Sequence, residues 1–148
     1  MFNSIVVGTD GSPTATRAVS AAADLARTTG ARLHILTVVK GPSAVLVGAD
    51  VSGVTALSGS DWEALSREDL ETILDDASRI AGEGLSVQAH SSQGDPADAL
   101  IELAERVSAD LIVVGNRGMT GARRFLLGSV PNRVSHHAGC SVLIVRTS

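Results

Sequence analysis

Short apolar runs alternate along this chain with stretches whose apolar residues recur at helical spacing, and this alternation restricts the fold more than any other feature. The apolar runs predict five strands, at residues 4–8, 32–39, 86–91, 111–114 and 141–145. The helical spacing predicts helices that begin after 12, near 65, after 95 and near 129. Strands separated by single helices pair in parallel through right-handed crossovers. We therefore predict one Rossmann-like α/β domain over residues 1–148, a doubly wound five-stranded parallel sheet in the order 3-2-1-4-5 with helices on both faces.

Local signals indicate where the helices begin and end. Ser12 and Pro13 supply an N-cap and a first helical residue, and Gly30 stands where that helix would end. Asp95, followed by proline, gives the same start signal before the next-to-last predicted strand. Residues 41–61 are rich in small residues and have no clear period, so we predict a long loop there and assign it no role.

Composition and charge narrow the class of protein. Hydrophobic residues make up 44% of the chain and aromatic residues only 2%, which predicts an aliphatic core. A net charge of −4 argues against the broad phosphate contacts of a nucleic-acid-binding protein. No apolar run approaches the about 20 residues of a membrane span, and no basic leader precedes the first strand. With Cys140 as the single cysteine, we expect a cytoplasmic protein that binds neither nucleic acid nor membrane.

A glycine-rich segment follows the fourth predicted strand. It contains Gly115, Gly118 and Gly128, and Ser129 comes directly after Gly128, which gives the pattern G-x2-G-x9-G-S. Glycines let backbone N–H groups approach an anion closely, and the first N–H groups of the helix that begins near Ser129 have no partner within the helix. Arg117 adds positive charge to the same loop. This segment predicts a phosphate-binding site.

A second glycine-bearing turn is expected to lie beside the first. In the predicted strand order the winding reverses between the first and fourth strands, and ligands bind at the carboxyl ends of the strands at such a point. Residues 8–12, with the sequence Gly-Thr-Asp-Gly-Ser, leave the first strand there, and residues 115–118 leave the fourth. The two turns therefore predict opposite sides of one site.

The sequence resembles the universal stress protein family, and specifically its ATP-binding branch. The resemblance rests on the complete glycine motif that ends at Ser129, on residues 5–12 with their Asp-bearing turn, and on the closing segments 126–130 and 141–145. It extends over the whole chain apart from the variable residues 41–61.

This resemblance implies one nucleotide-binding site built from both turns. In the family pattern Asp10 lies by the nucleotide with Thr9 beside it, and Val38 packs against the adenine edge. Val114 and Gly115 match the positions that line the base and ribose, and Gly118 matches the close approach to ribose and phosphate. The triphosphate cradle matches Gly128, Ser129 and Val130. We add Arg117 to the nucleotide-binding residues on its charge alone.

The ligand expected from the resemblance is ATP, or AMP, with Mg²⁺ possible alongside ATP. Cyclic AMP stays open as the ligand, because members of the family that bind it share the glycine motif. The resemblance also implies a homodimer formed through the last strand, Ser141–Val145, at an edge of the sheet. We expect a stress-response regulatory protein, and the alternative from another class is a dimeric protein-interaction module whose nucleotide is only structural.

Motifs of other nucleotide-binding and catalytic classes are missing. No Lys follows the glycines as in a P-loop, and the turn after the first strand matches neither G-x-G-x-x-G nor the SGG loop of ATP pyrophosphatases. The chain also has no G-x-S-x-G elbow. Asp10, the one candidate base near the glycine loop, better suits hydrogen bonding to the nucleotide or holding Mg²⁺, so we predict no catalytic residue and at most slow ATP hydrolysis. His136 and His137 are helical neighbours that point about 100° apart, so we predict no metal site there.

Overall fold

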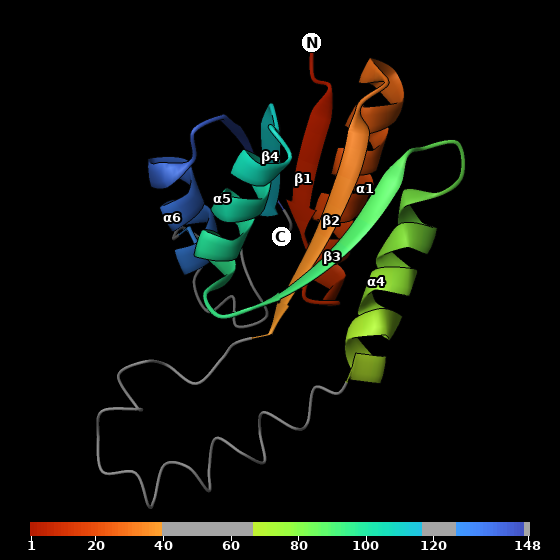
Figure 1. Ribbon diagram of the computed structural model, residues 1–148, viewed down its shortest axis with the longest axis horizontal. Coiled ribbons are helices and arrows are strands. Elements are labelled where there is room, and N and C mark those ends of the chain that lie inside the picture. The colour runs from red at the N-terminus through yellow and green to blue at the C-terminus, as the bar shows by residue number, and fades with distance from the viewer. Residues whose placement is uncertain (40–66, 117–126, 147–148) are drawn as a thin grey trace, which may run out of the picture.

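The computed structural model describes residues 1–39, 67–116 and 127–146, which contain one five-stranded sheet. Its strands, in chain order, are β1 (Ser4–Gly8), β2 (Arg32–Val39), β3 (Val87–Gln93), β4 (Leu111–Gly115) and β5 (Ser141–Val145). They lie in the order β3-β2-β1-β4-β5, and every neighbouring pair is parallel. The predicted doubly wound sheet and its strand order are confirmed (Figure 1).

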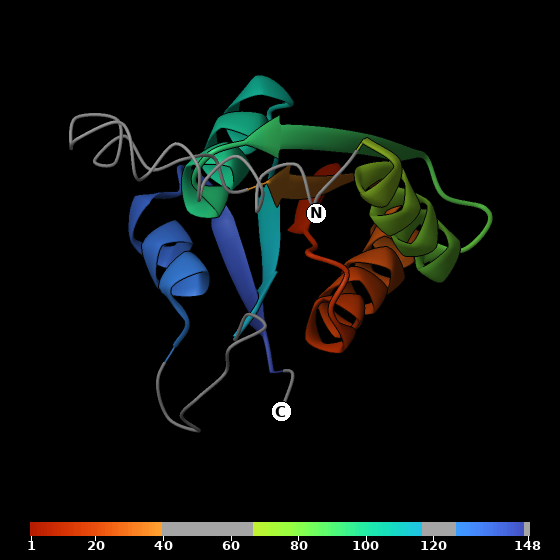
Figure 2. The same ribbon diagram turned by 90° about the horizontal axis from the view of Figure 1, so that it is seen from below.

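Helices cover both faces of this sheet. Those in the described residues are α1 (Pro13–Thr29), α4 (Arg67–Ala81), α5 (Pro96–Arg106) and α6 (Ser129–His137). Helices α1 and α4 lie on one face, and α5 and α6 lie on the other, as the view from below shows (Figure 2). None of these helices is long and apolar enough to cross a membrane.

The capping residues predicted from the sequence are in place. The Ser12 side chain accepts a hydrogen bond from the backbone N–H of Ala15 at 3.2 Å and begins α1. The Asp95 side chain accepts from the N–H of Asp98 at 3.0 Å and begins α5 in the same way. At the other end of α1, Gly30 has a φ of 75°, a left-handed conformation that favours glycine.

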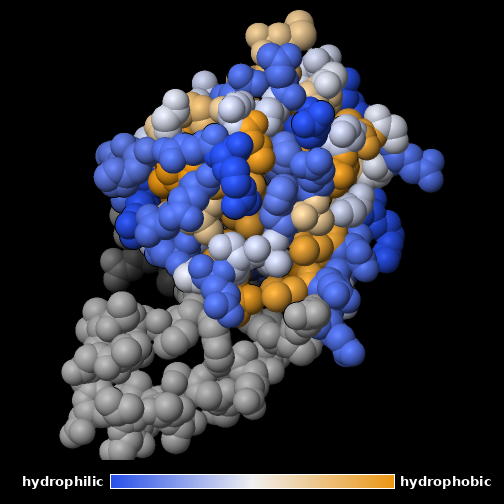
Figure 3. Space-filling view, viewed as in Figure 1, coloured by the Kyte–Doolittle hydropathy of each residue, from blue (hydrophilic) through white to orange (hydrophobic). Residues whose placement is uncertain are grey.

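The core consists of two aliphatic clusters, one on each face of the sheet. The α1-face cluster has these buried members: Ile5, Val7, Ala18, Val19, Ala22, Ala23, Ala26, Ala31, Leu33, Ile35, Ala77, Ala81, Leu111 and Val113. The α5-face cluster has these: Val6, Leu36, Ala97, Ala99, Leu100, Leu103, Ala104, Ile112, Val114 and Val134. Many of the helical members are alanines, which let the helices lie close to the sheet. The surface over α5, β3 and α4 is largely hydrophilic, with narrow hydrophobic strips between the polar side chains (Figure 3).

Strand β3 extends two residues beyond its predicted end at Ser91. Ser92 and Gln93 continue the parallel register with the end of β2. Backbone hydrogen bonds between parallel strands do not require apolar side chains, so the hydropathy pattern ends before the strand does. The predicted loop at 41–61 lies outside the described residues.

Asp110 ties the amino ends of the two central strands together. Its Oδ2 accepts hydrogen bonds from the backbone N–H groups of Asn3, at 2.6 Å, and Ser4, at 2.9 Å. These two donors hold the pKa of the Asp110 carboxyl below its usual value. The N-terminal residues are thereby fixed at the end of the sheet opposite to the turns that follow β1 and β4.

Candidate functional site

The winding of the sheet reverses between its two central strands, β1 and β4. They pair directly, with Val7 opposite Val113, and the chain then turns to α1 on one face and toward α6 on the other (Figure 2). The loops that leave a parallel sheet at such a point diverge and leave a crevice at the carboxyl ends of the strands. Thr9 and Asp10, which follow β1, and Gly115, which ends β4, therefore share this end of the sheet.

The turn after β1 is held by its own side chains. Thr9 is buried, its N–H donates to the Leu36 carbonyl at 2.8 Å, and its Oγ1 accepts from the N–H of Gly11 at 3.2 Å. Asp10 is exposed, and its Oδ1 accepts from the N–H of Ser12 at 2.9 Å. This conformation leaves the second carboxylate oxygen of Asp10 without a hydrogen bond to the described part of the chain.

Glycine is favoured at position 11 of this turn for two independent reasons. Its φ of +80° is left-handed, and a Cβ built there would lie 3.1 Å from Cγ1 of Ile73 in α4. The sequence did not indicate that Ile73 forms one wall of the turn, because 62 positions separate it from Gly11 and it reads as an ordinary apolar position of a helix.

The glycines on either side of the second turn are brought together by a backbone hydrogen bond. The N–H of Gly128 donates to the Asn116 carbonyl at 2.9 Å, while the N–H of Asn116 donates to the Val145 carbonyl at 2.9 Å. Gly115, the last residue of β4, therefore lies close to the start of α6. Asn116 occupies one of the two variable positions between Gly115 and Gly118, so the motif did not indicate that its backbone links β4 to α6. Arg117 and Gly118 lie outside the described residues, so both stay predictions.

Helix α6 begins without a side-chain cap. Its N-cap is Gly128, with no side-chain hydrogen bond at that position, whereas Ser12 and Asp95 cap α1 and α5. The first helical hydrogen bond is donated by Asn132 to the Gly128 carbonyl, at 3.1 Å. The N–H groups of the first turn thus face no capping oxygen of their own helix, and the positive end of the helix dipole favours an anion there.

Three of the predicted apolar site residues lie against one cluster. Val114 is a buried member of the α5-face cluster, and Val38 and Val130 are half-buried side chains that pack against it. These residues come from β2, β4 and α6, so the fold joins positions that lie far apart in the sequence. All three lie on the α5 face of the sheet, and Val38 and Val114 stand near the carboxyl ends of their strands, as the Thr9–Asp10 turn does.

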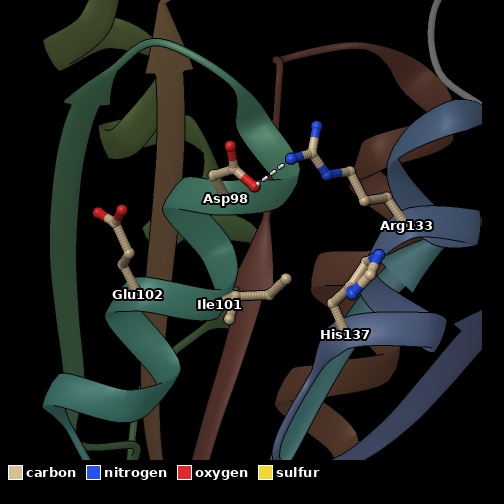
Figure 4. A pocket seen from close by; sticks show the side chains of 5 residues that line it. All are labelled: Asp98, Ile101, Glu102, Arg133 and His137. Atoms are coloured by element: carbon tan, nitrogen blue, oxygen red, sulfur yellow. Dashed lines mark ion pairs between the residues drawn. The ribbon is translucent and has the colours of Figure 1, made fainter.

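A separate groove of about 340 Å³ lies between α5 and α6 (Figure 4). Arg133 of α6 crosses it to pair with Asp98 at 2.9 Å and with Asp95 at 3.7 Å. These side chains are about half exposed, so the pairs are each worth at most about 1 kcal/mol. None of the predicted site residues lines this groove. No group of three or more His, Cys, Asp or Glu suited to a metal ion occurs in the described residues.

The sheet order, the reversal of winding and the two glycine-bearing turns define a Rossmann-like α/β protein. The chain belongs to the universal stress protein family, whose model matches residues 1–146. It is 37% identical over 150 residues to universal stress protein Rv1636 of Mycobacterium tuberculosis, covering 99% of this chain and 98% of that protein. It is 33% identical over 150 residues to universal stress protein YxiE of Bacillus subtilis, covering 99% and 100% of the two chains.

Among solved structures, the chain is similar to a universal stress protein crystallised in complex with cAMP. The TM-score is 0.73 at 33% sequence identity, and the match covers 99% of this chain and 98% of the other. The likeness therefore extends over the fold as a whole.

The two constraints on Gly11 can be separated with a matched pair of variants. Gly84 also has a left-handed φ, of +81°, but a Cβ there would meet nothing within 4 Å. We expect Gly84→Ala to lower the free energy of unfolding by about 1–2 kcal/mol through backbone strain alone. Gly11→Ala should lower it by more, because Ile73 must also move. Denaturant unfolding of both variants measures the difference, and equal losses would show that the Ile73 contact does not constrain the turn.

Proposed function

We propose that this protein binds an adenine nucleotide, with ATP preferred, at the crevice between the β1–α1 turn and the start of α6. The observation that carries the proposal is the uncapped N-terminus of α6, joined by the Gly128–Asn116 hydrogen bond to the end of β4. A helix start of this kind favours phosphate groups. The cAMP complex of a family member at 33% identity supports an adenine nucleotide as the ligand class.

The chain supplies complementary groups for each part of such a ligand. The complete motif from Gly115 to Ser129 matches the ATP-binding branch, with backbone N–H groups of Ser129 and Val130 for the phosphates. The apolar side chains of Val38, Val114 and Val130 suit the flat face or edge of adenine. The second oxygen of Asp10, which accepts no hydrogen bond from the described residues, would accept one from the nucleotide or hold Mg²⁺ that arrives with ATP. Arg117 adds positive charge for the phosphates.

The same residues give little support for fast ATP hydrolysis. Among residues 8–12, 115–116 and 127–130, Asp10 is the one side chain that can act as a base, and one of its oxygens already accepts from Ser12. Efficient general base catalysis needs a group poised to take a proton from water. We therefore propose a regulatory protein of the stress response, with slow turnover or none. Cys140, a free thiol, fits a cytoplasmic location.

Calorimetric titration with Mg–ATP tests the proposed site. Gly128 has a φ of −60°, which any residue adopts, so Gly128→Val should fold normally while placing a side chain at the N-cap of α6. We expect binding to weaken at least tenfold, or about 1.4 kcal/mol. Gly139→Val is the matched control. Gly139 lies just beyond the far end of the same helix, and a Cβ built there would meet nothing within 4 Å. Equal affinities for the two variants would remove the α6 N-terminus from the site.

Cyclic AMP is the second candidate ligand, favoured by the complex of the similar family member. The two nucleotides differ in their phosphates: ATP carries an extended chain of several charges, and cyclic AMP carries a single ring phosphate. We expect ATP to displace labelled cyclic AMP at lower concentration than the reverse, because the glycine motif offers a longer row of backbone donors than one phosphate uses. Displacement in the opposite order assigns the site to cyclic AMP.

We also propose a homodimer formed through β5, which lies at one edge of the sheet. Leu143 is 36% exposed and belongs to neither core cluster, and the strand is apolar from Val142 to Val145. The opposite edge, β3, carries mainly polar residues. An exposed apolar edge is a site for pairing with a second strand. In the alternative reading, this dimer is the interaction module itself and its nucleotide is only structural.

Sedimentation of two lysine variants tests this interface. Leu143→Lys should convert a wild-type dimer to monomer, because a charge would be buried between the paired edges. Ser91→Lys places the same charge on the exposed face of the other edge strand and should leave the dimer intact. A monomeric wild type, or a dimer that persists in Leu143→Lys, would contradict the interface. If the protein still binds a protein partner in the Gly128→Val variant, that result would favour the alternative of an interaction module whose nucleotide is only structural.

A further inference from the structure

Two histidines of neighbouring strands are hydrogen-bonded to each other outside the candidate site. Nδ1 of His34 in β2 lies 3.0 Å from Nε2 of His90 in β3, and the ring centroids are 5.2 Å apart. In the parallel register, His90 is opposite Leu36, two residues beyond His34, so both rings lie on the α5 side of the sheet. Each neutral imidazole has one donor and one acceptor nitrogen, so the pair is satisfied when both rings are neutral.

The surroundings of this pair disfavour positive charge. His34 is only 2% exposed, and His90 is half-buried. Burial, the His90 ring and Arg32 all lower the pKa of His34, and burial and Arg106 of α5 lower the pKa of His90. The other nearby groups do not compensate within the described residues. Strands β1 and β3 contribute no further charged side chain, and the exposed Glu102 and Glu105 of α5 form no ion pair with either ring; Asp98 is paired with Arg133 instead.

Strand β3 is held by its seven-residue backbone pairing with β2, and few side chains add to that pairing. It is one of the two outer strands of the sheet, and among the described residues β2 is the one strand it pairs with. Val87 packs against the α1-face cluster, but from Gln88 to Gln93 the strand carries one alanine and otherwise polar residues, several of them exposed. The His34–His90 hydrogen bond therefore joins the middle of a polar edge strand to the buried strand beside it.

We propose that the His34–His90 pair is an acid-sensitive latch that holds the edge strand β3 on β2 at neutral pH and weakens as the pair takes up protons. When both rings are protonated, both facing nitrogens are donors, the hydrogen bond is lost, and two positive charges lie side by side under α5 near Arg106. This property is separate from nucleotide binding and does not depend on it.

The direction of the pH effect follows from proton linkage. The pKa of each ring is lower in the closed state than in a state where β3 has separated and the rings are hydrated. The open state therefore binds more protons as the pH falls below about 6.5, the ordinary histidine value. The opening equilibrium should increase by up to about tenfold per pH unit for each histidine, until the pH reaches the lowered pKa of the closed state. Above about pH 7 the latch adds no pH dependence.

Hydrogen exchange of backbone amides between pH 7.5 and 5 tests the proposal on the full-length protein. After correction for intrinsic exchange rates, the opening equilibrium constant of the β3 amides bonded to β2 should be at least about tenfold larger at pH 5 than at pH 7. The opening constants of amides in the central strand β4 should change less. An opening equilibrium of β3 that does not vary with pH, or that varies in parallel with β4, would overturn the latch.

Two glutamine variants link the effect to the pair. His90→Gln keeps a hydrogen-bonding side chain but cannot be charged, so the acid-dependent opening of β3 should be reduced at least severalfold. His136→Gln removes an exposed histidine of α6 and should leave it unchanged. An unaltered pH response in His90→Gln would overturn the proposal. Should that variant fail to fold, titration of the wild-type histidine ring protons by NMR decides: a pKa above the ordinary value for either His34 or His90 would contradict the latch.

Discussion

The pairing of β1 with both β2 and β4 is the constraint on which the rest of this structure depends. Ile5, Val6 and Val7 are wholly buried, because helices cover both faces of the strand and a strand lies on each side. This central position forces the chain to leave β1 toward one face and β4 toward the other. Helices α1 and α6, which follow these strands, therefore lie on opposite faces, and the carboxyl end between them is where ligands bind in an open parallel sheet.

Glycines around this crevice serve different physical purposes. A Cβ at Gly8 would lie 3.2 Å from Leu100, so the small residue lets α5 approach the sheet. Gly11 supplies a left-handed φ, and Gly128 leaves the start of α6 without a side-chain cap. Of the three, Gly128 is the one that we propose contributes directly to phosphate binding, through the missing cap. The glycines around this crevice thus serve in part the packing of the fold and in part the proposed ligand site.

The two edges of the sheet differ in character, and we propose different roles for them. β5 is apolar and exposes Leu143, which suits permanent pairing with a second copy. β3 is polar and is joined to β2 by a hydrogen bond between two ionisable rings, which suits reversible weakening in acid. The proposed nucleotide crevice lies at the carboxyl ends of the strands, apart from both edges.

The sequence by itself determined the elements, their order and the family. Ser12, Asp95 and Gly30 act within one helical turn of their own position, and the alternation of short apolar runs with helical periods leaves few topologies. Only the tertiary structure decided that Ile73 closes on Gly11, that Gly128 bonds to Asn116 and that His34 meets His90. These contacts join positions 12 to 62 residues apart. Local pattern carries no signal for such pairs, since each depends on how strands and helices pack once the sheet has formed.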